Sequence, residues 1–105
     1  MHEPRQQLRQ RLRQPGILRS LAVHDAFTAK VCETAGIELL FLGGFGAAAS
    51  GYGLPDVGLL GLAEMADAAR RIAGAVRVPV IVDGDTGYGS LPNVVRTVRE
   101  FERAG

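Results

Sequence analysis

The chain has 105 residues, with 12 lysines and arginines against 11 aspartates and glutamates and a formal net charge of +1. This length holds one compact domain or part of a larger one. The balanced charge gives no electrostatic basis for binding nucleic acid or an anionic membrane, and the 47% of hydrophobic residues excludes disorder. No apolar segment reaches the roughly 20 residues that cross a bilayer, and the N-terminus lacks the apolar core of a secretory signal. We therefore expect a cytoplasmic protein, in which the single cysteine, Cys32, is a packed thiol.

Strands and helices are predicted to alternate along the chain. An N-terminal helix over residues 3–14 ends at Pro15 and Gly16. The later strands are runs of consecutive apolar residues, as in parallel sheets covered on both faces, and the helices carry apolar residues at helical spacing. Three strands are predicted over 17–23, 37–44 and 78–83, and the helices that follow them over 25–34, 61–75 and 91–104. The glycine-rich segment 43–60 is predicted to be a long loop, and such loops are usually functional.

This order of elements is typical of a parallel sheet with right-handed crossovers, and two folds fit it. A doubly wound sheet binds ligands where the strand order reverses, whereas a (β/α)8 barrel collects its chemistry in the loops after the carboxyl ends of its strands. A barrel needs about 250 residues, so three βα units are less than half of one. In the barrel case we expect the chain to be an incomplete piece.

Two carboxylates, Asp83 and Asp85, follow the third strand directly. Side chains alternate along a strand, so the two carboxylates point to the same side if the chain stays extended. Like charges in a partly dry site repel, and a shared proton or a divalent cation relieves the repulsion. Oxygen ligands of this kind favour Mg2+ or Mn2+. The alternative is that both residues are turn and cap residues, satisfied by backbone N–H groups.

Two other segments in the predicted loops resemble known motifs but differ from them at required positions. The segment 83–94 begins like a calcium-binding loop, but Tyr88 and Val94 occupy the positions that require glycine and glutamate. The segment 44–49, GFGAAA, matches a variant of the dinucleotide-binding fingerprint, but we expect Gly51, Gly53 and Pro55 to interrupt the helix that the pyrophosphate needs. Its glycine-rich backbone can still bind a carboxylate or a phosphate through N–H groups.

Three segments together carry a resemblance to a known family: HDAFTAKVCETAG (24–36), GYGLPD (51–56) and VDGDTGYG (82–89). From Pro15 onward the chain resembles the isocitrate lyase and phosphoenolpyruvate mutase superfamily, in particular the branch of methylisocitrate lyase, dimethylmalate lyase and oxaloacetate decarboxylase. The resemblance implies an α/β fold, the N-terminal part of a (β/α)8 TIM barrel, with residues 1–14 as a preceding helix and 15–105 as the partial barrel domain. It also implies Mg2+, with Mn2+ as the alternative, and an enolate formed next to a 2-oxo acid.

The resemblance also implies roles for individual residues. Asp85 would be the direct Mg2+ ligand. Asp83 would be a second ligand or would accept a hydrogen bond from a metal-bound water, and it would also bind the substrate. Asp56 would be catalytic, approaching from a mobile loop that closes over the site. The substrate carboxylate and oxo group would be bound at Gly43, Gly44 and Phe45. Relatives often carry serine at the first of these positions, so binding here would depend on backbone N–H groups.

Two further features bear on function. His24 occupies a position where relatives often carry tyrosine, and we expect it to pack at the strand end. The lysine- and cysteine-bearing loop that supplies the acid and base in the lyases would lie beyond Gly105, so we expect no turnover from this chain alone.

Three functions remain open. The first is a Mg2+-dependent carbon–carbon lyase acting on a 2-methylisocitrate-like or oxaloacetate-like acid. The second is a phosphonopyruvate mutase or hydrolase, and the third is a non-catalytic half-barrel. The expected partner is a small carboxylic acid, with no nucleic acid and no membrane, and the resemblance implies a homo-oligomer, a tetramer, for the full-length protein.

Overall fold

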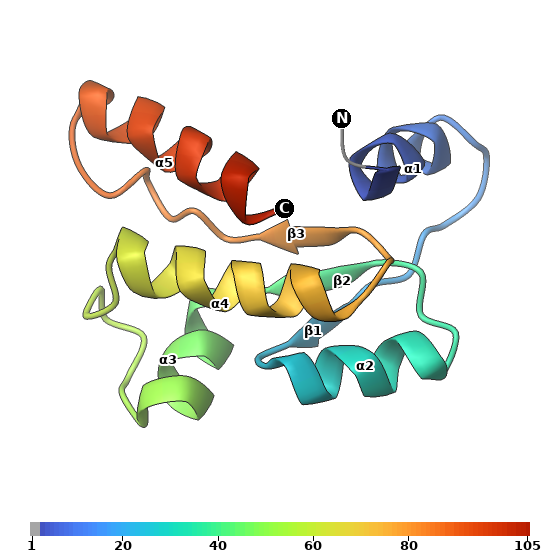
Figure 1. Cartoon of the computed structure of the whole chain (residues 1–105), viewed down its shortest axis with the longest axis horizontal. Coiled ribbons are helices and arrows are strands. Elements are labelled where there is room, and N and C mark those ends of the chain that lie inside the picture. Colours follow the sequence, from blue (N-terminus) through green and yellow to red (C-terminus); the bar gives the residue numbers. More distant parts are fainter. Residues whose placement is uncertain (1–2) are drawn as a thin grey trace.

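The computed structural model describes residues 3–105, and within them a parallel sheet is covered by helices (Figure 1). The strands lie in the order β1–β2–β3 and are joined by helical crossovers. In chain order the elements are α1 (Glu3–Leu12), β1 (Leu21–Val23), α2 (Ala26–Thr34), β2 (Leu40–Leu42), α3 (Gly44–Tyr52), α4 (Leu62–Ala75), β3 (Val80–Val82) and α5 (Leu91–Ala104). The expected alternation of strands and helices is confirmed.

The strands are shorter than the sequence predicted, with three residues each. The apolar run 17–23 pairs with β2 only over Leu21–Val23, while Ile17 is 90% exposed. The run 37–44 is paired only over Leu40–Leu42, because Gly43 already caps the next helix. The predicted strands were too long, because the apolar runs continue beyond the residues that pair with a neighbouring strand.

The predicted loop 43–60 contains a helix, α3, which is the main correction to the expected fold. Two alanines of this helix, Ala47 and Ala48, are buried at 4% and 3% exposure, and their packing favours the helix despite the nearby glycines. Gly51 lies inside α3 and does not interrupt it. Gly53 ends the helix in the left-handed conformation, with φ of 65°.

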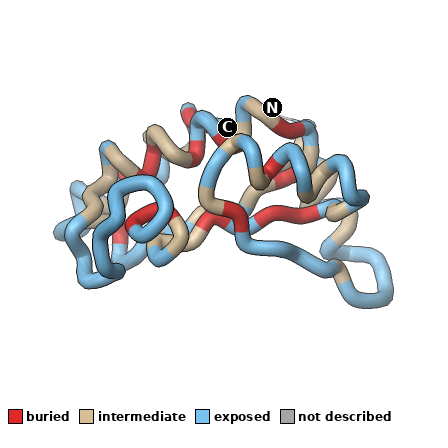
Figure 2. The backbone as a smooth tube through the Cα atoms, turned by 90° about the horizontal axis from the view of Figure 1, so that it is seen from below, coloured by how far each residue is buried: buried red, intermediate tan, exposed pale blue. Residues whose placement is uncertain are grey.

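The core lies between the sheet and the helices α2, α4 and α5, which cover one face (Figure 1). Leu40 and Leu42 of the central strand are fully buried, as are Met65 and Ile72 of α4. Figure 2 shows the buried residues inside the molecule and exposed residues along the connecting loops. Helix α4 is amphipathic and provides more residues to this core than any other helix of the described chain.

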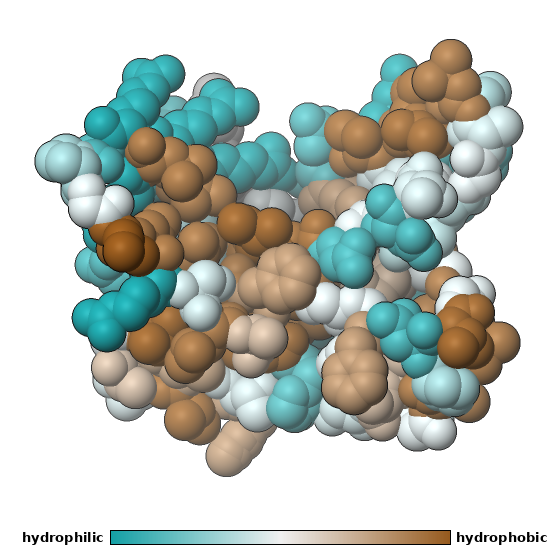
Figure 3. Space-filling view, turned by 180° about the vertical axis from the view of Figure 1, so that it is seen from behind, coloured by the Kyte–Doolittle hydropathy of each residue, from teal (hydrophilic) through white to brown (hydrophobic). Residues whose placement is uncertain are grey.

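The other face of the sheet is not covered by a helix. Ala22, Phe41 and Ile81 are aligned in the register of the three strands, and all three are exposed. Hydrophobic side chains spread over this side of the molecule (Figure 3). A sheet with apolar residues on both faces is expected in a parallel fold in which the second face is also buried, as in a barrel interior.

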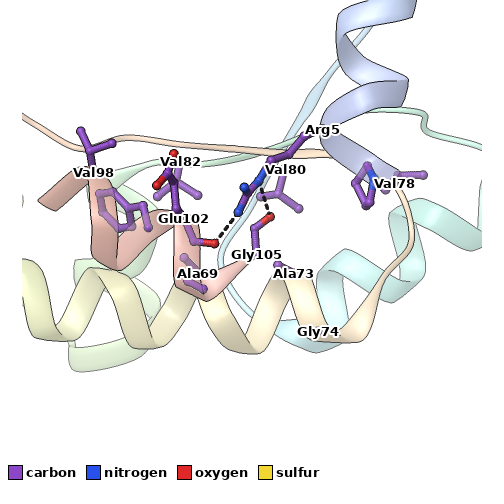
Figure 4. A pocket seen from close by; sticks show the side chains of 13 residues that line it. Arg5, Ala69, Ala73, Gly74, Val78, Val80, Val82, Val98, Glu102 and Gly105 are labelled. Atoms are coloured by element: carbon purple, nitrogen blue, oxygen red, sulfur yellow. Dashed lines mark hydrogen bonds between the residues drawn. The ribbon is translucent and has the colours of Figure 1, made fainter. Parts of the chain in front are cut away.

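Helix α1 packs beside the C-terminal end of α5. The Arg5 guanidinium donates hydrogen bonds to the carbonyl oxygens of Gly105, at 3.2 Å, and of Glu102 (Figure 4). These bonds satisfy carbonyls that the last turn of a helix leaves without intrahelical partners. A cavity of about 520 Å³ lies between these helices, α4 and β3, and its walls are largely apolar. In the described part of the chain, no helix is long and apolar enough to cross a membrane.

The central strand allows a test of this core. Replacing Leu40, which is fully buried, with alanine should lower the free energy of unfolding by about 2–5 kcal/mol, through lost burial and the cavity that remains. Leu91→Ala is the matched control, because Leu91 is 77% exposed, and its effect should stay within about 0.5 kcal/mol. Urea denaturation measures both, and equal losses in the two variants would contradict this core.

Candidate functional site

The connections that follow β2 and β3 meet at one edge of the sheet. The two strands are parallel, so their carboxyl ends lie side by side, and the Asp83 N–H donates a 2.9 Å hydrogen bond to the Leu42 carbonyl. A Cβ atom placed on Gly44 would lie 3.4 Å from Oδ1 of Asp56 and 3.7 Å from Oδ2 of Asp83. Two of the predicted acidic residues therefore converge over the first residue of α3.

A small cavity of about 30 Å³ marks this convergence. Its lining includes all three predicted acidic residues, Asp56, Asp83 and Asp85, together with Gly44 and Tyr88. This volume exceeds the roughly 10–15 Å³ that one water molecule needs, so it suits a water molecule or a small ion. The structure thus brings the acidic residues of the two loops together, as expected for chemistry at the carboxyl ends of parallel strands.

The backbone between Asp83 and Asp85 is turned, so the assumption of an extended chain is wrong. Asp85 has a φ of 49°, in the left-handed region, and its N–H donates a 2.8 Å hydrogen bond to Oδ1 of Asp83. Aspartate side chains commonly accept a bond from the N–H two residues on and so form a local turn. Asp83 therefore has the turn role given above as the alternative. Its second oxygen, Oδ2, faces Gly44 and the cavity.

The N-terminus of α3 provides backbone donors at the same place. Gly43 is the N-cap and makes no side-chain cap, and the first N–H groups of a helix have no intrahelical acceptor. The partial positive charge of this end favours anionic groups. A Cβ atom on Gly43 would lie 3.1 Å from the Phe41 ring, which explains the glycine. The predicted Phe45 contributes only its backbone here, because its side chain is 70% exposed and does not line the cavity.

Tyr88 is a site residue that sequence reasoning did not select. Its ring packs against the core and it lines the same cavity as the three acidic residues. Burial, and then the negative charges of Asp83, Asp85, Asp56 and Glu64, raise the pKa of Tyr88 to about 12. The sequence does contain a signal for Tyr88, because this tyrosine lies between two glycines shortly after the acidic pair. Glycines on both sides indicate a tight turn with an unusual backbone conformation.

The loop that carries Tyr88 is fixed to α5. Thr97 is buried, and its hydroxyl donates a 2.7 Å hydrogen bond to the Gly87 carbonyl. A Cβ atom on Gly87 would lie 2.4 Å from a methyl group of Val94, so the loop approaches the helix too closely for any side chain. Ser90 and Asn93 then form the capping box at the start of α5.

His24 and Cys32 lie outside this cavity. His24 is half-buried at the start of α2, with Nε2 3.5 Å from Oδ2 of Asp25. Asp25 is the N-cap and accepts a 2.7 Å hydrogen bond from the Thr28 N–H, which lowers the pKa of the Asp25 carboxyl. Cys32 is partly buried against the core, as expected of a packed thiol.

The donor set fits a hard divalent cation with few protein ligands. Among residues 3–105, no group of three or more histidines, cysteines, aspartates and glutamates is arranged to hold a metal ion. Mg2+ is commonly bound by one or two carboxylates, with water and substrate oxygens completing its shell. Asp83 and Asp85, with Asp56 across the cavity, match that smaller requirement in ligand chemistry and charge.

The family model described as phosphoenolpyruvate phosphomutase matches residues 8–105. The chain belongs to this family. Over 82 residues it is 52% identical to 2,3-dimethylmalate lyase of Eubacterium barkeri, a match that covers 78% of this chain and 28% of that protein.

Solved structures agree with this family. The crystal structure of phosphoenolpyruvate phosphomutase from Streptomyces platensis subsp. rosaceus superposes with a TM-score of 0.90 and 40% identity, covering 95% of this chain and 34% of that one. Phosphonopyruvate hydrolase in complex with oxalate and Mg2+ superposes with a TM-score of 0.76 and 35% identity, covering 82% of this chain and 30% of that one. The expected fold, three βα units of a TIM barrel, is confirmed. The chain spans about a third of the length of these relatives.

The position of Tyr88 predicts an unusual titration. In a Tyr52→Phe variant Tyr88 is the remaining tyrosine, and ultraviolet absorbance of the phenolate should show a midpoint near pH 12 in the folded chain. In the unfolded chain the midpoint should be near 10. The unfolded state then loses its proton first, so this contribution to stability is complete below about pH 10 and is lost as the pH rises toward 12. A midpoint near 10 in the folded chain would contradict the burial of Tyr88 beside the acidic residues.

Proposed function

We propose that this chain provides the metal- and substrate-binding edge of a Mg2+-dependent carbon–carbon lyase that acts on a 2-methylisocitrate-like or oxaloacetate-like acid. The observation that carries the proposal is the convergence of Asp56 and Asp83 over Gly44, in a cavity that Asp85 also lines. The 52% identity to a dimethylmalate lyase favours carbon–carbon bond cleavage over chemistry on a phosphonate. When bound, Mg2+ would supply positive charge beside the oxygen of the developing enolate.

In this proposal Asp83 and Asp85 hold the cation, and Asp83 contributes more than Asp85. The reason is the turn, which fixes one oxygen of Asp83 on the Asp85 N–H and leaves the other facing the cavity. A carboxylate that is already oriented loses less freedom when it binds an ion. This reverses the order expected from an extended chain, in which Asp85 was the more direct ligand.

Asp56 is proposed to act on the bound substrate from the opposite side of the cavity. It lies in the segment after α3, and its Oδ1 is the nearest atom to the position of a Gly44 Cβ. Leu54, two residues earlier, is tied back to α3 by a 3.0 Å hydrogen bond from its N–H to the Ala48 carbonyl. Asp56 therefore follows a segment that is tied to α3, and any closure of the loop over the substrate would begin after this point.

The substrate carboxylate is proposed to bind at the N-terminus of α3. The N–H groups of Gly44 and Phe45 lie in the first turn of this helix, where intrahelical acceptors are absent and an anion is favoured. No serine hydroxyl is present at Gly43, so binding depends on the backbone. A Cβ atom at Gly43 would press on the Phe41 ring, whereas one at Gly44 would only touch the Asp56 and Asp83 carboxylates.

A carbon–phosphorus bond enzyme is the second candidate. It is supported by the similarity to phosphoenolpyruvate phosphomutase and phosphonopyruvate hydrolase, at 40% and 35% identity. In either case the acid and base of the reaction would come from the part of the relatives' length that this chain does not span. We therefore propose no turnover by this chain alone. The cytoplasmic location and the tetramer remain predictions.

Calorimetric titration of Mg2+ in the presence of oxalate tests the metal assignment. Asp83→Asn keeps the shape of the side chain and removes its charge, and should weaken Mg2+ binding at least roughly tenfold, the lower range for partners of metal ligands. Asp85→Asn should weaken it less, and Asp56→Asn should change oxalate affinity more than Mg2+ affinity.

Asp67→Asn is the matched control for this titration. It removes the same charge from the outer side of α4, where Asp67 accepts a 2.9 Å hydrogen bond from Arg71 Nε. This variant should bind Mg2+ as the parent chain does. The assignment is wrong if Asp83→Asn and Asp85→Asn both bind Mg2+ as tightly as the parent, or if Asp67→Asn weakens binding to the same degree.

A further inference from the structure

Tyr88 carries the one side-chain hydroxyl among the described residues that line the acidic cavity. The other polar side chains there are Asp56, Asp83 and Asp85, and an ionised carboxylate can only accept hydrogen bonds. An anionic ligand that enters this cavity therefore meets three side chains that cannot donate a proton to it. Among the side chains that line the cavity, the Tyr88 phenol is the hydrogen-bond donor that remains.

The backbone holds Tyr88 in a conformation that only a specific loop supports. Its φ of 59° lies in the left-handed region, which is uncommon for a residue with a bulky side chain. Gly87 and Gly89 on either side also have positive φ, of 94° and 143°. Strained residues of this kind cluster at binding and active sites, where the surrounding structure maintains them. Here the support is the buried bond from Thr97 to the Gly87 carbonyl.

The ring of Tyr88 is tied to the core, whereas its hydroxyl has no partner within residues 3–105. The ring packs with the core cluster that includes Met65, which also lines the cavity. Hydrogen bonds in this loop join Asp85 to Asp83 and Thr97 to Gly87, and none involves the Tyr88 hydroxyl in the described chain. A partly buried ring with an unpaired hydroxyl beside a cavity is arranged to bond a ligand.

We propose that the Tyr88 hydroxyl donates a hydrogen bond to an oxygen of the carboxylic acid bound at the mouth of this cavity. Tyr88 is thus a binding residue that lets an anion occupy a site otherwise lined by carboxylates, and it favours ligands with an oxygen acceptor at this position. The proposal rests on the function proposed above, because it takes the ligand to be a small carboxylic acid bound with Mg2+.

Oxalate affinity at saturating Mg2+ tests the hydroxyl directly. Tyr88→Phe removes only the oxygen and keeps the ring, so the packing of the loop is preserved. One hydrogen bond to a charged oxygen is lost, and oxalate should bind about tenfold more weakly or worse. Mg2+ affinity without oxalate and the midpoint of thermal unfolding should stay at the parent values, which separates a contact to the ligand from a structural role.

Tyr52→Phe is the matched control and also supplies a spectroscopic reading. The chain has two tyrosines and no tryptophan, and Tyr52 ends α3 away from the cavity lining. Tyr52→Phe should bind oxalate as the parent does, and its tyrosine fluorescence, which then comes from Tyr88, should change when oxalate is added. In Tyr88→Phe the remaining fluorescence of Tyr52 should not respond.

Each alternative result identifies what is wrong. If Tyr88→Phe binds oxalate like the parent while Asp83→Asn loses Mg2+, the role of Tyr88 is refuted and the proposed function stands. If Tyr88→Phe weakens Mg2+ alone to the same degree as oxalate, the hydroxyl acts on the carboxylates or the cation, and the inference is wrong. If the parent chain binds neither Mg2+ nor oxalate, both the inference and the proposed function are refuted.

Discussion

The pairing of β2 with β3 determines where every group of the candidate site lies. Its last hydrogen bond, from the Asp83 N–H to the Leu42 carbonyl, places the first residue after β3 beside the first residues after β2. From that point the two chains diverge, one into α3 and the other into the turn at Asp85. A shift of one residue in this register would turn the side chain of Asp83 to the other face of the sheet. The buried residues Leu40 and Leu42 oppose such a shift.

Helix α5 gives the second loop its shape, at a cost in backbone strain. Asp85 and Tyr88 both have positive φ, and each costs roughly 1–2 kcal/mol relative to an ordinary conformation. The buried hydroxyl of Thr97 and the close approach of Gly87 to Val94 hold the loop against that cost. As a result, helix α5, which directly follows this loop, holds Asp85 and Tyr88 at the cavity that they line.

Much of the fold could be predicted because its signals are local. Apolar runs located the strands. Helix α5 begins and ends at the predicted residues, and Ser90 and Asn93 form the cap at its start. The acidic pair was found because aspartates directly after a buried strand are unusual. The family resemblance then supplied Asp56, which no local pattern connects to Asp83.

What sequence reasoning missed depends on contacts that the pattern of apolar residues does not reveal. Helix α3 was predicted as a loop because glycines outweighed Ala47 and Ala48, whose burial stabilises the helix. The turn at Asp85 forms because the Asp83 side chain accepts a hydrogen bond from the Asp85 N–H. Such a bond competes with an extended backbone, and the spacing of apolar residues does not reveal it. Tyr88 was not selected because its importance arises from three acidic residues on two separate loops.

The central claim is that Asp83 and Asp85 hold a cation in the cavity at the N-terminus of α3, which Asp56 also lines. The most direct test adds substoichiometric Mn2+ to the 15N-labelled chain and maps the paramagnetic broadening of its amide signals. The account predicts that the strongest broadening falls together on Gly44, Asp56, Asp83 and Tyr88. Strongest broadening on acidic residues elsewhere, such as Glu100 and Glu102 of α5, or an even loss of signal along the chain, would contradict it.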